Sequence, residues 1–391
     1  MSRLRASRFG EAGSRALIVG GGIGGLATAI ALSRAGVEVQ VFERAPEIRE
    51  VGAGISLWAN AIRALDRLGV RAAIDRASVA YEAAGLRSAD GAIISAISAE
   101  ELHRLLGIPV IVVHRADLLA ALLAAVPSSS ISYGAVCTGI AARGDRVEVE
   151  IADGRRVQGD LLVGADGLHS VVRAALHGSE KPRYSGCSAW RAVVTFDVSR
   201  VRASETWGGG NLFGQVPISG NRVYWYAGMN VPEGGRSADA QAELRAVFGS
   251  WHSPIGELIE AADNTTILRN DIYDRPVLKT WGRGRVTLAG DAAHPMTPFL
   301  GQGACQALED AVLLGRCLAD SRDVVTGLRE YERQRIPRAN AFVTRSRAVG
   351  RIARLRNPVL AAIRNSVLKR ISPIAQARQI ASLVGAGSPL T

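Results

Sequence analysis

The chain has 391 residues, 48% of them hydrophobic and 21% charged, which is the composition of an ordinary globular protein. Its formal net charge is +11, yet twelve Lys or Arg residues and no acid lie between positions 333 and 391, so the rest of the chain is nearly neutral. This basic segment lacks the interleaved aromatic residues of a single-strand binder, and we expect no nucleic-acid partner. No apolar run is long enough to span a membrane.

Targeting and redox signals are weak. Residues 1–14 carry basic side chains but no hydrophobic region of a secretory signal, and we expect a flexible leader. The cysteines show neither metal-ligand nor disulfide spacing, which predicts no metal site and favours the reducing cytoplasm. They are Cys137, Cys187, Cys305 and Cys317.

The segment 16–44 has the pattern of a dinucleotide-binding unit. An apolar run at 16–19 predicts a buried parallel strand, a helix follows to about residue 35, and residues 37–42 predict a second strand. Glycines in G-x-G-x-x-G spacing separate the first strand from the helix. They are Gly20, Gly22 and Gly25.

Each of these glycines has a physical role. Gly20 allows a tight turn, Gly22 lets a pyrophosphate approach the backbone, and Gly25 lets the helix pack closely on the strand. The helix N-terminus adds free N–H groups and a positive dipole end. Glu43 follows the second strand, where a carboxylate accepts the ribose hydroxyls of an adenosine. The chain is therefore expected to bind a dinucleotide.

Periodicity and turn residues predict the remaining elements. From 54 to 164 we expect helices at 60–68 and 118–126, a hairpin over 86–97, and strands at 109–113, 131–133, 134–141, 146–151 and 157–164. Aromatic, strand-like segments between 187 and 230 predict an antiparallel sheet, which the 83–98 hairpin joins. Later elements are helices at 238–248, 255–261, 302–318 and 325–349 and strands at 265–272 and 286–289.

The predicted fold class is α/β with an α+β insert. Parallel strands come from 16–42, 157–164 and 286–289, so the Rossmann-like nucleotide domain is discontinuous, over 15–82, 99–182 and 273–345. The inserted sheet domain covers 83–98 and 183–272, and basic helices cover 346–391. Apolar residues of the basic segment 333–391 recur at helical spacing, which predicts helices that cover the body with their arginines in solvent. A basic amphipathic surface that touches anionic lipid or a partner stays open as an alternative.

Three distant segments have the same character: 20–26, 160–170 and 285–311 each join an apolar strand to small residues and an acid. Ligands of open α/β sheets bind at the carboxyl ends of the strands, so these tips are expected to meet one extended cofactor. Asp291 suits a hydroxylated linker such as ribityl. Residues 301–303 begin a helix whose N–H groups can face an electron-rich ring oxygen.

These motifs resemble those of the class A flavoprotein monooxygenases, the para-hydroxybenzoate hydroxylase family. The dinucleotide fingerprint, a D-G motif at Asp166-Gly167 and a G-D motif at Gly290-Asp291 occur in the family's order over about residues 15–345. Cys305 stands where the family often has Asn, as in the branch that resembles FAD-dependent urate hydroxylases and zeaxanthin epoxidases.

The resemblance implies FAD as cofactor and assigns residues to it. Glu43 would bind the adenosine ribose, Arg115 the phosphate-ribityl region, Asp291 the ribityl chain, and the backbone of 301–305 the isoalloxazine. The full set of cofactor residues is Gly20, Gly22, Ile23, Gly25, Glu43, Arg44, Gly54, Ile55, Arg115, Val136, Asp166, Gly167, Gly290, Asp291, Pro298, Gly301, Gln302, Gly303, Ala304 and Cys305.

The resemblance also implies a reaction. NAD(P)H reduces FAD, O₂ adds at flavin C4a, and the resulting hydroperoxide transfers one oxygen atom to a small aromatic or alkene substrate by hydroxylation or epoxidation. The candidate catalytic residues are Arg191, Tyr226 and His294. Because Trp225 and Tyr226 are adjacent on a strand, at most one of them faces the substrate pocket. The protein is expected to be a cytoplasmic monomer or homodimer, with membrane contact only through its basic C-terminal helices.

Structural interpretations of these residues stay open. Arg115 could be a helix-start arginine paired to Asp117, and Asp166 could cap a helix ahead of Ser170. His294 could be structural, although imidazole titrates near neutrality. Cys305 has the features of a buried small hydrophobic residue rather than a nucleophile.

Other functions are less consistent with the sequence. A flavin halogenase needs a W-x-W-x-I-P signature and a matching lysine, and the chain's only lysines are Lys181, Lys279 and Lys369. A simple NAD-dependent dehydrogenase would leave the D-G and G-D motifs without a role. Another flavin oxidoreductase, and a non-catalytic flavin-binding or membrane-docking protein, remain alternatives.

Overall fold

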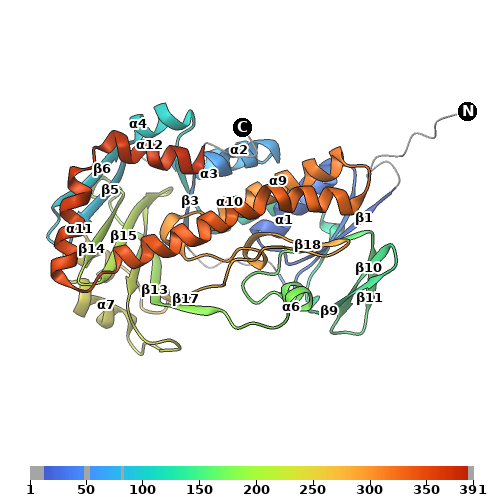
Figure 1. Ribbon diagram of the computed structural model, residues 1–391. Coiled ribbons are helices and arrows are strands. Elements are labelled where there is room, and N and C mark those ends of the chain that lie inside the picture. Colours follow the sequence, from blue (N-terminus) through green and yellow to red (C-terminus); the bar gives the residue numbers. More distant parts are fainter. Residues whose placement is uncertain (1–12, 48–52, 81–82, 386–391) are drawn as a thin grey trace, which may run out of the picture.

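A computed structural model describes residues 13–47, 53–80 and 83–385 of the chain. Most of the expected leader lies outside these residues. Two sheets stand at opposite ends of an elongated molecule, and the long helix α10 (Val324–Ala353) runs between them (Figure 1).

A five-stranded parallel sheet organises the nucleotide-binding half. Its order is β18 (Val286–Leu288), β12 (Leu161–Gly164), β1 (Arg15–Val19), β2 (Glu38–Phe42) and β8 (Ile131–Ser132). The three expected parallel segments are thus neighbours. One prediction was wrong: residues 157–164 are not one strand. They divide at Asp160, whose carboxylate accepts from the backbone N–H of Arg15, into β11 (Arg156–Gly159) in another sheet and β12 in this one.

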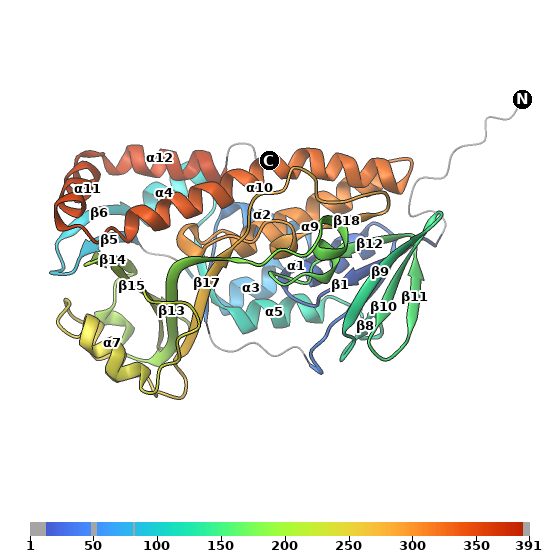
Figure 2. The same cartoon turned by 60° about the horizontal axis from the view of Figure 1, so that its bottom comes forward.

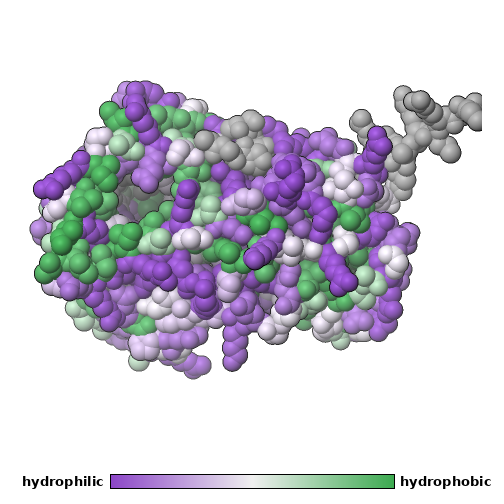
Figure 3. Space-filling model, viewed as in Figure 1, coloured by the Kyte–Doolittle hydropathy of each residue, from purple (hydrophilic) through white to green (hydrophobic). Residues whose placement is uncertain are grey.

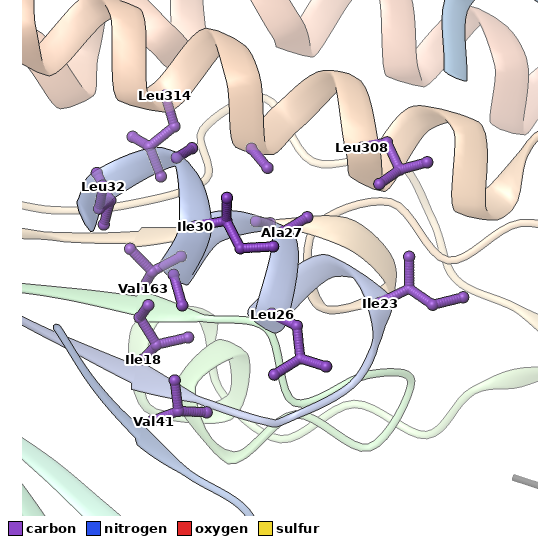
Figure 4. Packing of buried hydrophobic residues seen from close by; sticks show 14 of the residues in the cluster. Ile18, Ile23, Leu26, Ala27, Ile30, Leu32, Val41, Val163, Leu308 and Leu314 are labelled. Atoms are coloured by element: carbon purple, nitrogen blue, oxygen red, sulfur yellow. The ribbon is translucent and has the colours of Figure 1, made fainter. Parts of the chain in front are cut away.

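Two helices form a layer over this sheet. Helix α1 (Ile23–Arg34) presents Leu26 and Ile30 to the layer between the strands and α9 (Gly303–Asp320), which contributes Leu308 and Leu314 (Figure 4). The helices come close at Gly315, where an added Cβ would lie 3.1 Å from the Cβ of Ala31. Near the helix starts, an added Cβ at Gly24 would lie 3.4 Å from the Cβ of Ala307, so the N-termini of α1 and α9 lie close together.

Smaller elements surround the sheet. A three-stranded sheet of β9 (Cys137–Arg143), β10 (Arg146–Ile151) and β11 packs on β1 and β12 (Figure 2). Another consists of β3 (Gly54–Leu57), β7 (Ile111–His114) and β4 (Val79–Ala80). The helices of this region are α2 (Ala59–Arg67), α3 (Arg71–Ala77), α4 (Ala99–Leu106), α5 (Arg115–Ala124) and α6 (Val171–His177). Sequence analysis did not predict α3, α4 or α6, each of which is eight residues or shorter.

A seven-stranded sheet forms the other half. Its order is β17 (Leu268–Asp274), β13 (Arg183–Thr195), β16 (Arg222–Met229), β15 (Asn211–Ile218), β14 (Ser204–Gly208), β5 (Ala83–Ser88) and β6 (Ile93–Ser98). The β5–β6 hairpin joins this sheet as predicted, but β5 pairs with β14 in parallel, so the sheet is not wholly antiparallel. A parallel pair needs a long connection, and more than a hundred residues separate β5 from β14 along the chain.

One face of this sheet is covered by α7 (Ala240–Phe248) and α8 (Ile255–Glu260). Trp190, Phe213 and Trp225 point to these helices and are fully buried. Because side chains alternate along a strand, the residues between them point to the opposite face. That face is turned toward the nucleotide-binding half, because Tyr224 on it packs in one cluster with Val112 of β7.

The C-terminal helices correct one interpretation. Helices α11 (Pro358–Arg370) and α12 (Pro373–Val384) follow α10, which runs through the expected boundary at 346. The arginines of this segment do not all lie in solvent: Arg335 is fully buried and Arg364 nearly so. The apolar residues Val359, Ile363 and Val367, which were expected to cover the body, are exposed instead. None of the helices in the described part of the chain is long and apolar enough to cross a membrane.

Candidate active site

The glycine turn after β1 lies against the D-G segment after β12. An added Cβ at Gly20 would overlap the carbonyl oxygen of Ala165, and one at Gly25 would overlap that of Gly20. An added Cβ at Gly22, by contrast, meets no atom within 4 Å, and no side chain caps the N-terminus of α1. The turn is therefore closed on its protein side and open where a phosphate would approach.

The Asp166 side chain has the helix-capping contacts that we left open. Its carboxylate accepts from Val171 N at 2.7 Å, Val172 N at 3.3 Å and Ser170 Oγ at 2.5 Å, at the start of α6. Burial nevertheless raises the pKa of Asp166. Gly167 has a positive φ of 74° and open space around it. The contact of this segment with FAD stays a prediction.

The residues predicted to bind the adenosine lie at the end of β2. Glu43 accepts from Gly21 N at 2.6 Å and from Ala45 N at 2.8 Å, so its carboxylate ties the strand end to the glycine turn. The backbone N–H of Ala135 donates to the Glu43 carbonyl, which places Val136 beside it with 43% of its surface exposed. Arg44 is exposed on the same strand end.

Asp291 lies at the opposite end of the cofactor motifs. Its side chain is open to solvent, yet surrounding protein atoms raise its pKa, while His294 and Arg115 act in the other direction. A carboxylate that is both accessible and closely surrounded lies in a concave site. The charge of Arg115 also reaches Tyr224, and Arg115 begins α5 with its N–H bonded to Ala53.

A buried polar network holds the turn at Gly290. Asp310 accepts from Gly290 N at 2.8 Å, His294 Nε2 at 2.5 Å and Arg335 Nε at 2.6 Å. Burial alone would raise the pKa of Asp310, but His294 and Arg335 outweigh it and hold that pKa below its usual value. Arg335 also pairs with Glu309 at 2.6 Å.

His294 is part of this network rather than of an open surface. Its side chain is fully buried, with its ring 5.3 Å from that of Trp281. The structural interpretation of His294 therefore has direct support, and we treat it as a positioning residue. A direct catalytic role remains an untested prediction.

The loop before α9 completes the cofactor side. Gly301 has a φ of 59° and is exposed with Pro298, whereas Gln302 is buried and accepts from Asn60 Nδ2 at 3.1 Å. No side chain caps α9, and space is open at Gly303. Cys305 is fully buried, and burial raises the pKa of its thiol to about 12, as suits a small hydrophobic residue.

These features fit FAD. An uncapped helix start beside Gly22 suits its pyrophosphate, the accessible Asp291 carboxylate suits its ribityl hydroxyls, and the uncapped start of α9 suits its ring. Gln302 Nε2 is a buried donor with no hydrogen-bond partner in the described part of the chain. Gly54 and Ile55 lie in β3, beside Tyr224 of the second sheet.

The contact between Gly54 and Tyr224 joins the two halves. A Cβ on Gly54 would lie 2.5 Å from Tyr224 Cδ1, so the ring covers this glycine. Tyr224 and Tyr226 share one face of β16, with ring centroids 5.8 Å apart, whereas Trp225 is buried on the other. Tyr226 thus faces the cofactor half and Trp225 does not, in agreement with the prediction that at most one of them could.

A row of side chains crosses the sheet on this face. Directly opposed residues share a face, and the register pairs Arg191 with Tyr226, Tyr226 with Gly214, and Gly214 with Glu205. The missing side chain of Gly214 leaves room for the Tyr226 ring, which an added Cβ would overlap. The Arg191 guanidinium is half-buried and has no hydrogen-bond or ion-pair partner among residues 13–47, 53–80 and 83–385.

Glu205 was not among the predicted site residues. Its carboxylate accepts from Tyr226 Oη at 2.6 Å and from Trp207 Nε1 at 2.5 Å, and burial raises its pKa. Phe299, from the loop before α9, packs against the same cluster as Tyr226 and Trp207. An acid within a strand is uncommon, and this was the one available signal at Glu205.

Comparison with known proteins identifies the family. The FAD binding domain family matches residues 14–346. The chain is 43% identical over 365 residues to the aurachin C monooxygenase/isomerase of Stigmatella aurantiaca, with 93% of this chain and 95% of that protein covered. The chain belongs to the class A flavin monooxygenases. As in that family, FAD is its cofactor.

Other members of the family support this assignment. The monooxygenase is 36% identical to the 3-amino-4-hydroxybenzoate 2-monooxygenase of Streptomyces cremeus, over 85% of this chain and 86% of that protein. Its structure matches that of Klebsiella pneumoniae HpxO complexed with FAD and uric acid, with a TM-score of 0.91, 30% identity, and coverage of 97% and 98%. The expected FAD-dependent monooxygenase fold is thereby confirmed.

Proposed function

We propose that this monooxygenase uses NAD(P)H and O₂ to hydroxylate a small, electron-rich aromatic compound. The ring would lie between the loop before α9 and the sheet face that carries Arg191, Tyr226 and Glu205. The unpartnered Arg191 guanidinium on the face turned to the cofactor motifs carries this proposal. Relatives named for hydroxybenzoate and urate substrates support the aromatic class.

Bound FAD supplies the redox chemistry, which is electron transfer from NAD(P)H and activation of O₂. The chain's own residues position and polarise the substrate. Arg191 donates to an oxygen substituent on the ring, since a guanidinium binds a carboxylate or phenolate oxygen strongly. Arg191 would therefore fix the orientation of the ring relative to the flavin.

Tyr226 and Glu205 would act on a second substituent. Tyr226 Oη donates a hydrogen bond to Glu205 and can accept a hydrogen bond from a substrate O–H or N–H. This contact draws the substituent's proton away from the ring and makes the ring more electron-rich. Phe299, in the same cluster as Tyr226, and Tyr224, whose ring lies 5.8 Å from that of Tyr226, would help to exclude water from the contact.

Anaerobic titration of the purified protein with NADH and NADPH tests the proposal. We expect oxidised-flavin bands that either donor bleaches, faster with a true substrate among aurachin C, 3-amino-4-hydroxybenzoate and urate. Turnover under ¹⁸O₂ should place one labelled oxygen in the product, and an epoxide from an alkene would show the alternative reaction. If no compound speeds the bleaching and none gains labelled oxygen, the aromatic-hydroxylase proposal fails.

Arg191→Ala tests the residue that carries the proposal. Loss of a charged hydrogen bond should raise KM by about 10- to 100-fold, with the flavin spectrum unchanged. Arg222→Ala is the matched control on the neighbouring strand, where Arg222 Nε donates to the Ser219 carbonyl at 2.9 Å. Equal kinetics for both variants would show that Arg191 does not contact the substrate.

A further inference from the structure

Helix α11 exposes apolar side chains and buries an arginine, which is the reverse of the usual arrangement in a globular protein. Its residues Val359, Leu360, Ile363 and Val367 are 64, 50, 56 and 51% exposed. Their spacing of four residues places Val359, Ile363 and Val367 along one side of the helix. Figure 3 shows hydrophobic residues gathered at the end of the molecule where Figure 1 places α11. We call Val359, Leu360, Ile363 and Val367 the α11 strip.

A second side of α11, which borders the strip and carries Arg364 and Leu368, holds the helix in this orientation. Arg364 is the helix's buried residue, and its Nη1 donates to the carbonyls of Ile352 and Ala353 at 2.9 Å. Its guanidinium carbon lies 4.7 Å from the ring centroid of Trp207. Rotation of α11 to bury the strip would break these contacts, so the apolar exposure follows from the packing.

The apolar surface continues beyond α11. Ile371 and Ile374, at the junction with α12, are 37 and 44% exposed, and Ile352 at the end of α10 is 48% exposed. Contiguous apolar surface rimmed by polar residues marks an interaction site.

The rim of this surface is positive. Five exposed cations flank these apolar residues along the chain: Arg351, Arg356, Lys369, Arg370 and Arg378. No acid occurs between residues 333 and 391. Acids from neighbouring elements offset part of this charge. The pKa of Asp90 is lowered mainly by its hydrogen bond from Ser88 and, last among several causes, by Lys369, and α4, which packs on α12, carries Glu100 and Glu101. The surface therefore carries a strong excess of positive charge.

We propose that the α11 strip and its cationic rim dock on the surface of an anionic lipid bilayer. Apolar side chains enter the headgroup–acyl boundary while arginines and lysines meet lipid phosphates. A second copy of the chain is a poorer occupant, because pairing two such faces would bring ten cations together. The contact is interfacial, consistent with the lack of a membrane-spanning helix in the described part of the chain.

Docking would place the substrate site close to the lipid. Leu368, on the inner side of α11, packs in the same cluster as Trp207, Tyr226 and Phe299. The bilayer would therefore lie behind the wall of the substrate site. This last step rests on the proposed function, whereas docking itself does not.

Sedimentation of the FAD-loaded full chain with lipid vesicles tests the proposal. We expect binding to vesicles that contain phosphatidylglycerol, weaker binding to pure phosphatidylcholine, and a loss of binding as salt rises. Lys369→Gln and Arg370→Gln should each weaken binding to the anionic vesicles by about fivefold.

A matched pair of double variants separates the strip from general surface effects. Val359→Glu with Val367→Glu should lower vesicle affinity by about tenfold or more. Val277→Glu with Val325→Glu adds the same charge at valines that are 45 and 37% exposed elsewhere, and should lower it much less. The flavin spectrum and thermal unfolding of both variants check that the fold is intact.

Three results would overturn the proposal. They are no sedimentation with anionic vesicles, equal loss of binding in both double variants, and a stable dimer by light scattering that only the Val359/Val367 variant dissociates. The last result would assign the strip to a second copy. Flavin reduction and turnover in solution are measured separately, so failure of docking leaves the proposed function standing.

Discussion

The cofactor half and the sheet face solve the binding problem in different ways. At the cofactor half, backbone turns from three motifs meet, and each motif is a short continuous stretch of sequence. The critical feature at Gly20, Gly22 and Gly25 is the absence of side chains. On the sheet face, single side chains from separate strands form a row through their register. A site made of backbone turns therefore depends on the backbone conformation. A site made of a row of side chains depends on which residues occupy the row, and these residues can be substituted without loss of the fold.

Asp310→Asn should give the largest effect, because it disrupts the network that holds the Gly290 turn. Breaking a buried ion pair costs about 3–5 kcal/mol of unfolding free energy. Glu330→Gln, which alters the half-exposed pair with Arg333 on α10, is the control and should change stability little. Thermal unfolding by circular dichroism measures both.

The same variant has a defined pH signature. The folded-state pKa of Asp310 lies below the model-peptide value of 3.8, so its stabilisation is present above about pH 4 and is lost as pH falls through the folded pKa. The melting temperature of the wild type should therefore fall more steeply below pH 4 than that of Asp310→Asn. Parallel curves would contradict the assigned ion pair.

Gly25→Ala tests the backbone-built site directly. The new Cβ would overlap the Gly20 carbonyl, and such overpacking costs about 1–3 kcal/mol with loss of the turn that binds FAD. Gly22→Ala is the matched control, since space is open there and its φ of −75° suits alanine. It should keep the stability of the apo protein while weakening FAD, measured by fluorescence titration. Equal instability of the two variants would contradict the asymmetry.

Asp291→Asn should separate stability from cofactor affinity. Closely surrounding protein atoms raise the pKa of Asp291, so the ionised carboxylate costs folding free energy, and this cost grows as pH rises from the ordinary pKa to the raised one. The amide should stabilise the apo protein at pH 7–8 while it weakens FAD binding by about 10-fold. Destabilisation of the apo variant at this pH would contradict the assigned environment.

Tyr226→Phe should give the smallest effect and sharpen the view of the sheet face. The substitution removes one hydrogen-bond donor to Glu205. Loss of this donor raises the pKa of the Glu205 carboxyl further and lowers the free energy of unfolding by about 1 kcal/mol. We expect a kcat reduced several-fold, a pH dependence of kcat shifted to higher pH, and an unchanged flavin spectrum. A double-mutant cycle with Glu205→Gln checks whether the two residues act together. Additive effects would argue against a joint role.

The contiguous motifs made much of the cofactor half predictable. Strand, glycines, helix and acid lie within thirty residues, so local spacing and periodicity determine the unit, and β1, α1 and β2 agree with the prediction within two residues. The presence of β18, β12 and β1 in one parallel sheet followed from three similar strand ends. Short helices such as α3 and α4 were missed because their few turns carry little periodic signal.

The sheet face was only partly predictable. Arg191 and Tyr226 were chosen from an aromatic-rich region, but nothing local connects them to Glu205, which lies in another strand. The outward turn of α11 was also missed, because helical spacing shows that one side is apolar and does not show which way that side points.

The amino-acid sequence by itself determined the family, the cofactor and the β1–α1–β2 unit, because each depends on motifs whose own residues are close in the chain. Only the tertiary structure decided which side chains share the sheet face, that His294 and Arg335 are buried together around Asp310, and that the α11 strip faces outward. These features depend on strand register and helix rotation. Both are set by packing between segments that are distant in sequence, where local propensity carries no information.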